Sequence, residues 1–338
     1  MAVTIKDIAR ITGLSTSTVS LVLNHAECRI ASATREKVLK AAKEMNYRPN
    51  RLAAGLVTRK SKTIGLIVPD ITNGFFAEIA AEVENECMSA GYSVILCNTN
   101  DMPAQDVHYV DLLLESNIDG VLFVTAASLE RSGVDECLRL LNDADVPVVF
   151  IDREWYSETM VNVISDNEQG GYLACQHLLD LGHTRIGYIS GPMGVQSAQR
   201  RLYGYIQALQ DRGLPFASEL VLEGDYHTES GYVLSKRLLA QDVTAIIAGN
   251  DMMALGVYKQ VREKKLKIPR EISVVGFDNL AFTGFLEVPL TTVAQPTGEM
   301  GKTSAQKLLR MLDRQPQQSA VFSPQLVVRD STAPPRST

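Results

Sequence analysis

Short apolar runs alternate with stretches of helical periodicity along most of the chain, and this alternation constrains the fold more than any other feature. The runs occupy residues 64–68, 94–97, 120–124, 148–151, 161–164, 185–189, 220–222, 245–248 and 273–277. Such alternation is typical of parallel β-sheets whose strands are connected by flanking helices. The 338-residue chain carries too many of these runs for one small doubly wound sheet. We therefore predict an α/β fold with more than one core.

The region after residue 62 divides most naturally into two similar lobes, each with a doubly wound parallel sheet. We predict a first lobe at about residues 62–160 and 292–322, and a second lobe at about residues 161–291 and 323–330. The chain would leave the first lobe near residues 152–163 and return to it at residues 292–295.

The first 62 residues differ from the rest of the chain in charge. They contain 12 Lys and Arg against 4 Asp and Glu, which gives +8; because the whole chain carries −6, the remainder carries −14. A basic module on an acidic body favours binding to phosphates, because cationic side chains gain affinity by releasing counterions. Charge alone is equally compatible with a solvated basic surface.

The pattern of residues 1–48 predicts a domain of three short helices. Apolar residues recur at helical spacing from Ile5 to Ile11, and residues 12–14 (TGL) interrupt them. Residues 15–18 (STST) offer N-caps for a second helix, and a third helix is predicted at about residues 32–45. This order is that of a helix-turn-helix.

The second helix would have an inner and an outer side. The residues expected to face inward are Val19, Val22 and Leu23 of this helix and Val38, Leu39 and Ala42 of the third. Thr16, Ser17, Ser20 and Leu21 would then lie outward, near the helix N-terminus. Side chains at this place in a helix-turn-helix can reach base edges in the major groove of DNA.

Polar and aromatic side chains gather after several of the apolar runs, where open α/β sheets bind ligands. Carboxylates, amides and guanidinium groups can chelate neighbouring hydroxyls, and aromatic rings can cover the apolar side of a sugar. The predicted ligand-binding set is Asn73, Phe75, Phe76, Asp152, Arg153, Arg201, Asn250, Phe277, Asp278 and Gln295. Taken singly, each residue is as often a turn former or a helix cap. We expect Asp251 and Asn279 to be caps.

Residues 4–10 (TIKDIAR), 13–20 (GLSTSTVS) and 47–56 (YRPNRLAAGL), with Asn24, closely resemble the signature of the LacI/GalR (lactose-repressor) family. A bare helix-turn-helix is a weak signal, but this extended pattern is specific. The resemblance covers essentially the whole chain and implies a two-lobed fold like that of periplasmic binding proteins. It also implies that eight of the ligand-binding candidates, all except Phe75 and Phe277, match pocket positions of sugar-binding relatives. One departure is Gly74, where proline is common.

The same resemblance implies DNA-contacting roles. Thr16, Ser17 and Leu21 occupy base-reading positions, and Leu21 would make an apolar contact, such as one with a thymine methyl, where many relatives carry a basic or imidazole group. Residues 49–61 would form a hinge helix and linker that folds on DNA, with Leu56 wedged into the minor groove. The rest of the predicted DNA-binding set is Thr4, Ser15, Thr18, Ser20, Asn24, Arg51, Leu52 and Ala53.

These features predict a transcription repressor whose operator affinity changes when a small sugar or sugar derivative binds. The nearest alternative replaces the sugar with a purine or nucleoside, and the sign of the ligand's effect stays open. One small helix-turn-helix makes few contacts, so we expect a homodimer on a pseudo-palindromic operator. A periplasmic sugar receptor and a sugar-modifying enzyme are more distant alternatives.

Other functions have little support in the sequence. No apolar run approaches the roughly 18 residues of a membrane span, and the first residues lack signal-peptide features, so we expect a cytoplasmic protein without a membrane partner. The five cysteines form no C-x-x-C pair and the five histidines have no metal-binding spacing. We therefore expect buried, reduced thiols and neither metal nor cofactor. No nucleophile elbow or acid/base constellation indicates an enzyme.

Overall fold

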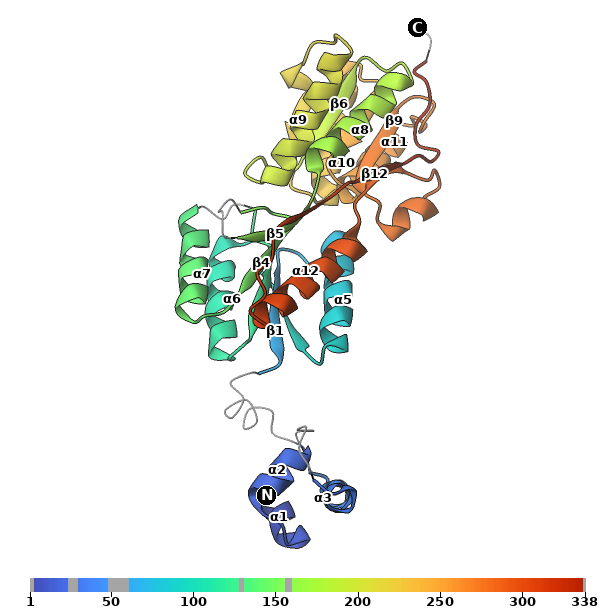
Figure 1. Cartoon of the computed structure of the whole chain (residues 1–338). Coiled ribbons are helices and arrows are strands. Elements are labelled where there is room, and N and C mark those ends of the chain that lie inside the picture. The colour runs from blue at the N-terminus through green and yellow to red at the C-terminus, as the bar shows by residue number, and fades with distance from the viewer. Residues whose placement is uncertain (1–2, 24–29, 48–60, 128–130, 156–159, 337–338) are drawn as a thin grey trace. The chain divides into compact units, whose positions relative to one another are not determined.

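The structure, a computed structural model, describes residues 3–23, 30–47, 61–127, 131–155 and 160–336. It contains two compact units, Met1–Lys62 and Thr63–Thr338, which are called the N-terminal unit and the two-lobed unit below. Figure 1 shows both units. Most of the predicted hinge, residues 49–60, lies outside the described residues.

The N-terminal unit contains the three predicted helices, α1 (Ile5–Thr12), α2 (Thr16–Leu23) and α3 (Ser32–Glu44). Gly13 ends α1 in a left-handed conformation with φ of 67°, which glycine adopts without a steric penalty. The buried core consists of Ile8, Ala9, Val19, Val22, Val38, Ala41 and Ala42. The expectation that Leu39 faces inward is wrong, because its side chain is 42% exposed and Ala41 packs into the core instead.

The first lobe of the two-lobed unit contains a six-stranded parallel sheet. Its strand order is β11-β5-β4-β3-β1-β2, and every neighbouring pair is parallel. The strands are β1 (Thr63–Val68), β2 (Ser93–Asn98), β3 (Gly120–Phe123), β4 (Val148–Ile151), β5 (Val161–Ser165) and β11 (Ala320–Phe322).

The second lobe repeats this architecture with one difference. Its strand order is β12-β10-β9-β8-β6-β7, and only the β10–β12 pair is antiparallel among the pairs described. The strands are β6 (Ile186–Ser190), β7 (Val221–Glu223), β8 (Ala245–Ala248), β9 (Ser273–Asp278), β10 (Thr291–Ala294) and β12 (Gln325–Val327).

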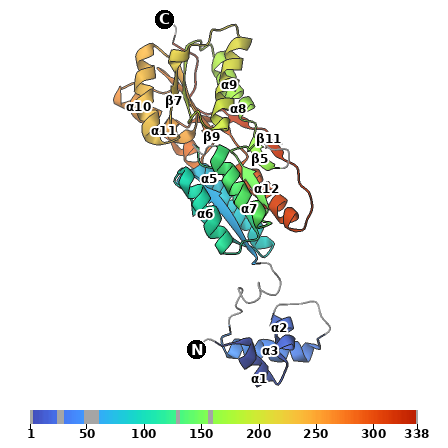
Figure 2. The same ribbon diagram turned by 90° about the vertical axis from the view of Figure 1, so that its left-hand side faces the viewer.

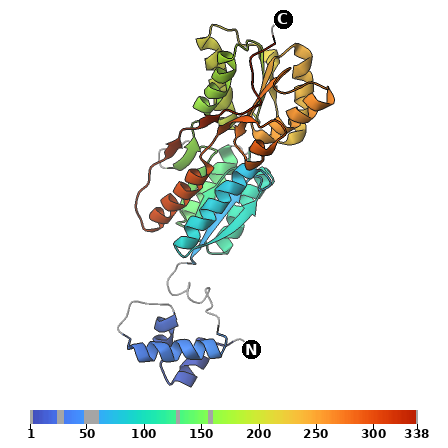
Figure 3. The ribbon, with the colours of Figure 1, turned by 90° about the vertical axis from the view of Figure 1, so that its right-hand side faces the viewer.

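Helices cover both faces of each sheet. In the first lobe α5 (Gly74–Ser89) and α12 (Thr297–Leu312) pack together on one face, and α6 (Pro103–Glu115) and α7 (Arg131–Asp143) on the other. In the second lobe the pairs are α8 (Asn167–Asp180) with α9 (Gln196–Asp211) and α10 (Thr228–Leu238) with α11 (Asp251–Glu263). Figure 2 shows these pairs on opposite sides of the second sheet, and Figure 3 shows the opposite view. Short 3-10 turns complete the lobe at η1 (Ser218–Leu220), η2 (Leu239–Gln241) and η3 (Ala281–Phe285).

Burial on both faces explains the continuous apolar runs of the strands. In β1, Ile64, Leu66 and Val68 pack toward α5 and α12, whereas Ile67 packs toward α6 and α7. A strand with helices on both faces has no solvent-facing side, so its sequence does not alternate with polar residues.

Sheet membership corrects two of the predicted lobe boundaries. The sequence pattern places residues 161–164 in the second lobe, but β5 pairs with β4 in the first. It returns the chain to the first lobe at residues 292–295, but β10 pairs with β9 in the second. The chain therefore crosses between the lobes after β5, after β10 and after β11. A strand buried on both faces looks the same whichever sheet it joins, so its local sequence does not identify its partner.

The cysteines that the structure describes are free and buried. Burial raises the pKa of the Cys87 and Cys97 thiols to about 11 and of the Cys137 and Cys175 thiols to about 12. These thiols stay protonated near neutral pH and behave as small apolar groups. Cys28 lies outside the described residues.

None of the described helices combines the length with the apolar character that crossing a membrane requires.

Candidate functional site

The N-terminal end of α2 presents the first candidate surface. Thr16, Ser17 and Leu21 are exposed there, with Leu21 at 43%, whereas Val19 and Val22 are fully buried on the opposite side. Hydroxyls and one apolar side chain can offer hydrogen bonds and a methyl contact to base edges. The helical period thus brings these three predicted residues to one accessible side.

Other members of the predicted DNA-binding set help to build the helices. Thr4 begins α1, since its amide and hydroxyl donate to Asp7 Oδ2 at 3.0 and 2.7 Å. Ser15 Oγ accepts the amide of Thr18 at 3.1 Å at the start of α2. Ser20 is half-buried. The remaining predicted residues, Asn24, Arg51, Leu52, Ala53 and Leu56, lie outside the described residues.

The second candidate site is a small cavity between the two lobes, at the carboxyl ends of their strands. We call it the central cavity; its volume is about 20 Å³, roughly room for one water molecule. It is lined by the predicted Asn73, Phe75, Phe76, Asp152, Arg153, Arg201, Asn250 and Asp278, together with Ser197 and Tyr226. The other two predicted residues lie behind the wall, Phe277 against Arg201 and Gln295 against Asp278. A ligand larger than water therefore requires side chains or lobes to move apart.

Arg201, on α9, is held rigidly in the wall of this cavity. Its side chain is only 4% exposed. Nε donates to Asn167 Oδ1 and Nη1 donates to the Gly249 carbonyl, both at 2.7 Å. The guanidinium carbon also lies 3.8 Å from the ring centroid of Phe277, a distance typical of a cation–π contact. These contacts fix the direction of a planar hydrogen-bond donor.

Two carboxyl groups face Arg201 from opposite lobes. Burial raises the pKa of Asp152, an effect that Arg201 and Arg153 oppose. Burial likewise raises the pKa of Asp278 to about 7 against the opposing effect of Arg201 and a hydrogen bond from Gln295 Nε2 at 2.8 Å. Both aspartates have a positive φ, 62° and 109°, a strained conformation that is common where side chains are aimed at a ligand.

Arg153 is the second buried guanidinium, 7% exposed. Its Nη1 donates to Asp101 Oδ1 at 2.7 Å and to the Thr125 carbonyl. Its Nε is buried without a hydrogen-bond partner among the described residues. The same holds for Asp152 Oδ1. Buried polar atoms without partners are uncommon and often mark a place for water or ligand.

The amides of the predicted set are helix caps as well as cavity walls. Asn73 Oδ1 accepts the Phe75 amide at 3.1 Å at the start of α5. Asn250 Oδ1 accepts the Met253 amide at 2.9 Å, and its Nδ2 donates to the Tyr226 carbonyl at 3.0 Å. Each of these two asparagines can therefore be a helix cap and a ligand-binding residue at the same time.

The residues expected only to be caps have different positions. Asp251 is the first helical residue of α11 rather than its cap, and it accepts Thr292 Oγ1 at 2.7 Å and the Leu280 amide at 2.8 Å. Asn279 Oδ1 accepts from Arg329 Nη2 at 2.6 Å. Neither lines the central cavity.

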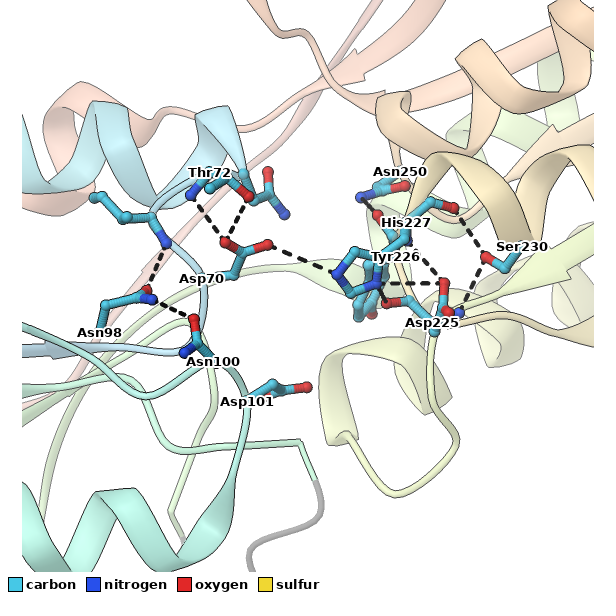
Figure 4. A network of polar contacts seen from close by, with 12 residues as sticks. Asp70, Thr72, Asn98, Asn100, Asp101, Asp225, Tyr226, His227, Ser230 and Asn250 are labelled. Carbon is cyan, nitrogen blue, oxygen red and sulfur yellow. Dashed lines mark hydrogen bonds and ion pairs between the residues drawn. The ribbon is translucent and has the colours of Figure 1, made fainter.

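A separate cavity of about 250 Å³ is lined by residues that include Asp70, Phe76, Tyr226 and His227. We call it the mouth of the cleft. Figure 4 shows its polar network. His227 Nε2, at the start of α10, lies 3.8 Å from Asp70 Oδ2 after β1, so this contact bridges the two lobes. Asp70 Oδ1 is fixed by the amide and hydroxyl of Thr72 at 2.9 and 2.6 Å.

Sequence reasoning misses Ser197, Tyr226 and Asp101. Tyr226 follows β7 and Asp101 follows β2, so the rule that selected residues after other strands would have found both. Ser197 stands in the first turn of α9, where a serine is more simply interpreted as a helix-start residue.

Two α/β lobes around a cleft of buried polar groups, joined to a basic helix-turn-helix unit, define the class of ligand-responsive DNA-binding proteins. Residues 61–327 match the family described as periplasmic binding proteins and sugar binding domain of LacI family. Residues 4–50 match the bacterial regulatory proteins of the lacI family.

The chain belongs to the lacI family of bacterial regulatory proteins. It is 37% identical to the HTH-type transcriptional repressor PurR of Vibrio vulnificus (strain CMCP6), over 97% of this chain and 98% of that one. A structure of the lac repressor dimer bound to operator and the anti-inducer ONPF is similar, with a TM-score of 0.86, 30% identity and coverage of 98% and 100%. A complex of the transcriptional regulator CelR with cellobiose has a TM-score of 0.73, 31% identity and coverage of 97% and 99%. The protein is thus a DNA-binding transcriptional repressor controlled by a small ligand.

Proposed function

We propose that the ligand of this repressor is a neutral polyhydroxy molecule, a sugar or sugar derivative, bound between the two lobes. The observation that carries this proposal is the balanced set of buried charges, Asp152 and Asp278 against Arg153 and Arg201. Asp101, which pairs with Arg153 at 2.7 Å, adds a third carboxyl group beside the two guanidinium groups. The carboxylates can therefore offset both positive charges, and the site offers no excess positive charge to an anionic ligand. Sugar hydroxyls both donate and accept hydrogen bonds, so one ligand can bond to the carboxylates and to the guanidinium groups.

A purine or nucleoside is the alternative, and the aromatic lining of the cavity favours it. Phe75 and Phe76 meet edge to face with centroids 5.1 Å apart, and Tyr226 lines the same cavity. A base could stack against such rings. A sugar can pack its apolar face against these rings, and its hydroxyls can also form hydrogen bonds with the buried carboxyl groups. We therefore favour the sugar.

The DNA-binding half of the proposal concerns α2 and the hinge. Thr16, Ser17 and Leu21 read base edges in the major groove, and Leu56 of the hinge enters the minor groove. The protein acts as a homodimer on a pseudo-palindromic operator. The similarity over 98% of the chain to a repressor dimer bound to operator supports this arrangement.

Control follows from differential binding. A ligand that contacts both lobes favours the lobe arrangement in which both sets of contacts form, and operator affinity changes only if DNA also distinguishes these arrangements. Such coupling is reciprocal, so operator DNA changes ligand affinity by the same factor.

Thermal unfolding of the full chain tests the ligand class, because a ligand of the folded state raises the melting temperature. We expect one or more pentoses, hexoses or their derivatives to raise it and Asp278→Ala to abolish the shift. Asp111→Ala, at an exposed position of α6, is the matched control and should keep the shift. A shift with adenine, guanine or a nucleoside but with no sugar would overturn the ligand class and leave the DNA-binding half intact.

A further inference from the structure

A larger cavity lies beside the central cavity, on the other side of Arg153. We call it the side compartment; its volume is about 370 Å³, and its walls include Arg153, Glu154, Trp155, Gln196 and Gln199. This volume falls within the range of roughly 300–1,000 Å³ that small-molecule sites occupy. Arg153 lines both cavities, so groups bound in the two would lie on either side of one buried guanidinium.

Trp155, the only tryptophan of the chain, is held in this wall by a buried amide. Asn162 Oδ1 accepts the Trp155 amide at 2.8 Å, and Asn162 Nδ2 donates to the Trp155 carbonyl at 3.0 Å. Asn162 itself is 6% exposed, and its backbone amide donates to Ser319 Oγ at 3.0 Å. The indole packs against the first-lobe core between the sheet and α6 and α7. The compartment therefore has a fixed aromatic wall.

Two residues of the compartment wall carry polar atoms that have no partner in the described part of the chain. Arg153 Nε and Gln196 Oε1 are buried and have no hydrogen-bond partner among the described residues. Gln199 Nε2 donates to the Met193 carbonyl at 2.6 Å, which holds this amide at the start of α9. A donor and an acceptor without partners cost free energy unless water or ligand satisfies them. An aromatic wall with amide and guanidinium groups is the combination that binds a sugar ring, by its apolar face and its hydroxyls.

The walls come from both lobes. Trp155 and Arg153 follow β4 of the first lobe, whereas Gln196 and Gln199 lie in the first turns of α9 in the second. A group bound here contacts both lobes and would thus strengthen the same lobe arrangement as a group in the central cavity.

We propose that the side compartment binds the second ring of a disaccharide or glycoside, whose first ring occupies the central cavity. The ligand class is then an oligosaccharide or glycoside rather than a free monosaccharide. This inference rests on the proposed sugar ligand, which it makes more specific.

The test uses the full chain, with calorimetry and the fluorescence of Trp155 as the two readouts. The probes are glucose, galactose and ribose, and the disaccharides cellobiose, maltose and lactose. We expect at least one disaccharide to bind at least tenfold more tightly than its constituent monosaccharides and to change the emission of Trp155, and the monosaccharides to leave this emission unchanged. A single tryptophan makes the source of the signal unambiguous.

Variants locate the second ring. Gln196→Ala should remove most of the tenfold advantage of the disaccharide without changing monosaccharide affinity. Gln210→Ala, at an exposed position of the same helix, should behave as the wild type. If Gln196→Ala unfolds, Gln199→Ala makes the same test at an exposed position.

Two results would overturn the proposal in distinguishable ways. If disaccharides bind no more tightly than monosaccharides, or bind equally well to both Gln→Ala variants without changing the Trp155 emission, the side compartment is not a sugar subsite and the sugar ligand class stands. If purines bind and no sugar does, both the ligand class and this subsite fail.

Discussion

The two units place their functional side chains in opposite environments. In the N-terminal unit the candidate groups of α2 are exposed and uncharged, above a core of seven buried apolar residues. In the two-lobed unit the candidate groups are buried except for the half-buried Asn73, and four of them are ionisable: Asp152, Arg153, Arg201 and Asp278. The basic charge of the first 62 residues supplies attraction to phosphates, which carries no sequence information. The buried charges instead balance one another and select for hydrogen-bonding geometry.

Because of this difference, a substitution in one unit should impair the function of that unit and leave the function of the other unchanged. A small core loses its fold when one large side chain is removed, since few other contacts compensate. When one charged side chain of the buried network is removed, ligand recognition should be lost, while the much larger cores of the lobes maintain the fold. Substitutions in each unit test this separation.

Ile8→Ala should have the largest effect and should act on DNA binding alone. Ile8 is fully buried in the N-terminal unit, and such truncations cost about 3 kcal/mol, comparable with the stability of so small a core. We expect operator binding to be lost in a mobility-shift assay while sugar binding by calorimetry is unchanged. Ile11→Ala, at a 60% exposed position of the same helix, is the control. Loss of sugar affinity in Ile8→Ala would show that the units are not separable.

Arg201→Met should act in the opposite way, on ligand binding. It removes the donors to Asn167 and Gly249 and leaves Asp152 and Asp278 facing less positive charge. Breaking such a buried network costs on the order of 3 kcal/mol, so we expect about 100-fold weaker sugar binding by calorimetry. The exposed Arg262→Met is the control. An unchanged ligand affinity would remove Arg201 from the site.

Ligand binding should depend on pH through Asp278, whose pKa is raised to about 7 by burial. The carboxylate accepts sugar hydroxyls better than the neutral acid does, so affinity should rise up to about tenfold between pH 6 and 8. The folded protein binds this proton more tightly than the unfolded chain. The contribution of Asp278 to stability is therefore fully present below its ordinary pKa of 3.8 and is lost as the pH rises through about 7.

The control for this pH dependence is Asp278→Asn, which cannot ionise. Calorimetry between pH 6 and 8 should give a nearly flat profile for this variant. A wild-type affinity that falls across this range, or a variant that keeps the wild-type slope, would contradict the assignment of Asp278 as an acceptor from the ligand.

His227→Ala at the mouth of the cleft should have the smallest effect. The His227–Asp70 contact of 3.8 Å bridges the lobes, but the His227 side chain is 64% exposed. Exposed pairs contribute little, so we expect less than about a threefold change in sugar affinity. His108→Ala, at an exposed position of α6, is the control. A tenfold loss measured by calorimetry would place His227 among the ligand-binding residues.

Much of the fold is readable from the sequence because its strands are buried on both faces. The runs that became β1 to β9 are mostly apolar, and each appears as a strand within about two residues of its predicted ends. β10, β11 and β12 are not among the predicted runs, because β10 begins with two threonines and the other two are only three residues long. The lobe to which β5 and β10 belong depends on distant partners, so the local pattern cannot supply it.

The candidate site could also be predicted from the order of the strands, but only in part. The ends of parallel strands are shared by a whole sheet edge, so polar residues that follow separate strands, such as Asp152 and Asp278, meet in space. What the pattern cannot supply is the depth of each side chain: Gln295 and Phe277 lie one layer behind the cavity wall. Tyr226 was missed because it stands three residues beyond the end of β7, whereas Asp152 directly follows β4.

The most direct test of ligand control is the affinity of the full chain for its operator with and without sugar. The operator is first selected from a random DNA pool, and binding is then followed by fluorescence anisotropy of the labelled duplex. We predict that saturation with a sugar that raises the melting temperature changes the operator Kd by about tenfold or more, in the range of typical allosteric couplings. A bound sugar that leaves the operator Kd unchanged would contradict this account.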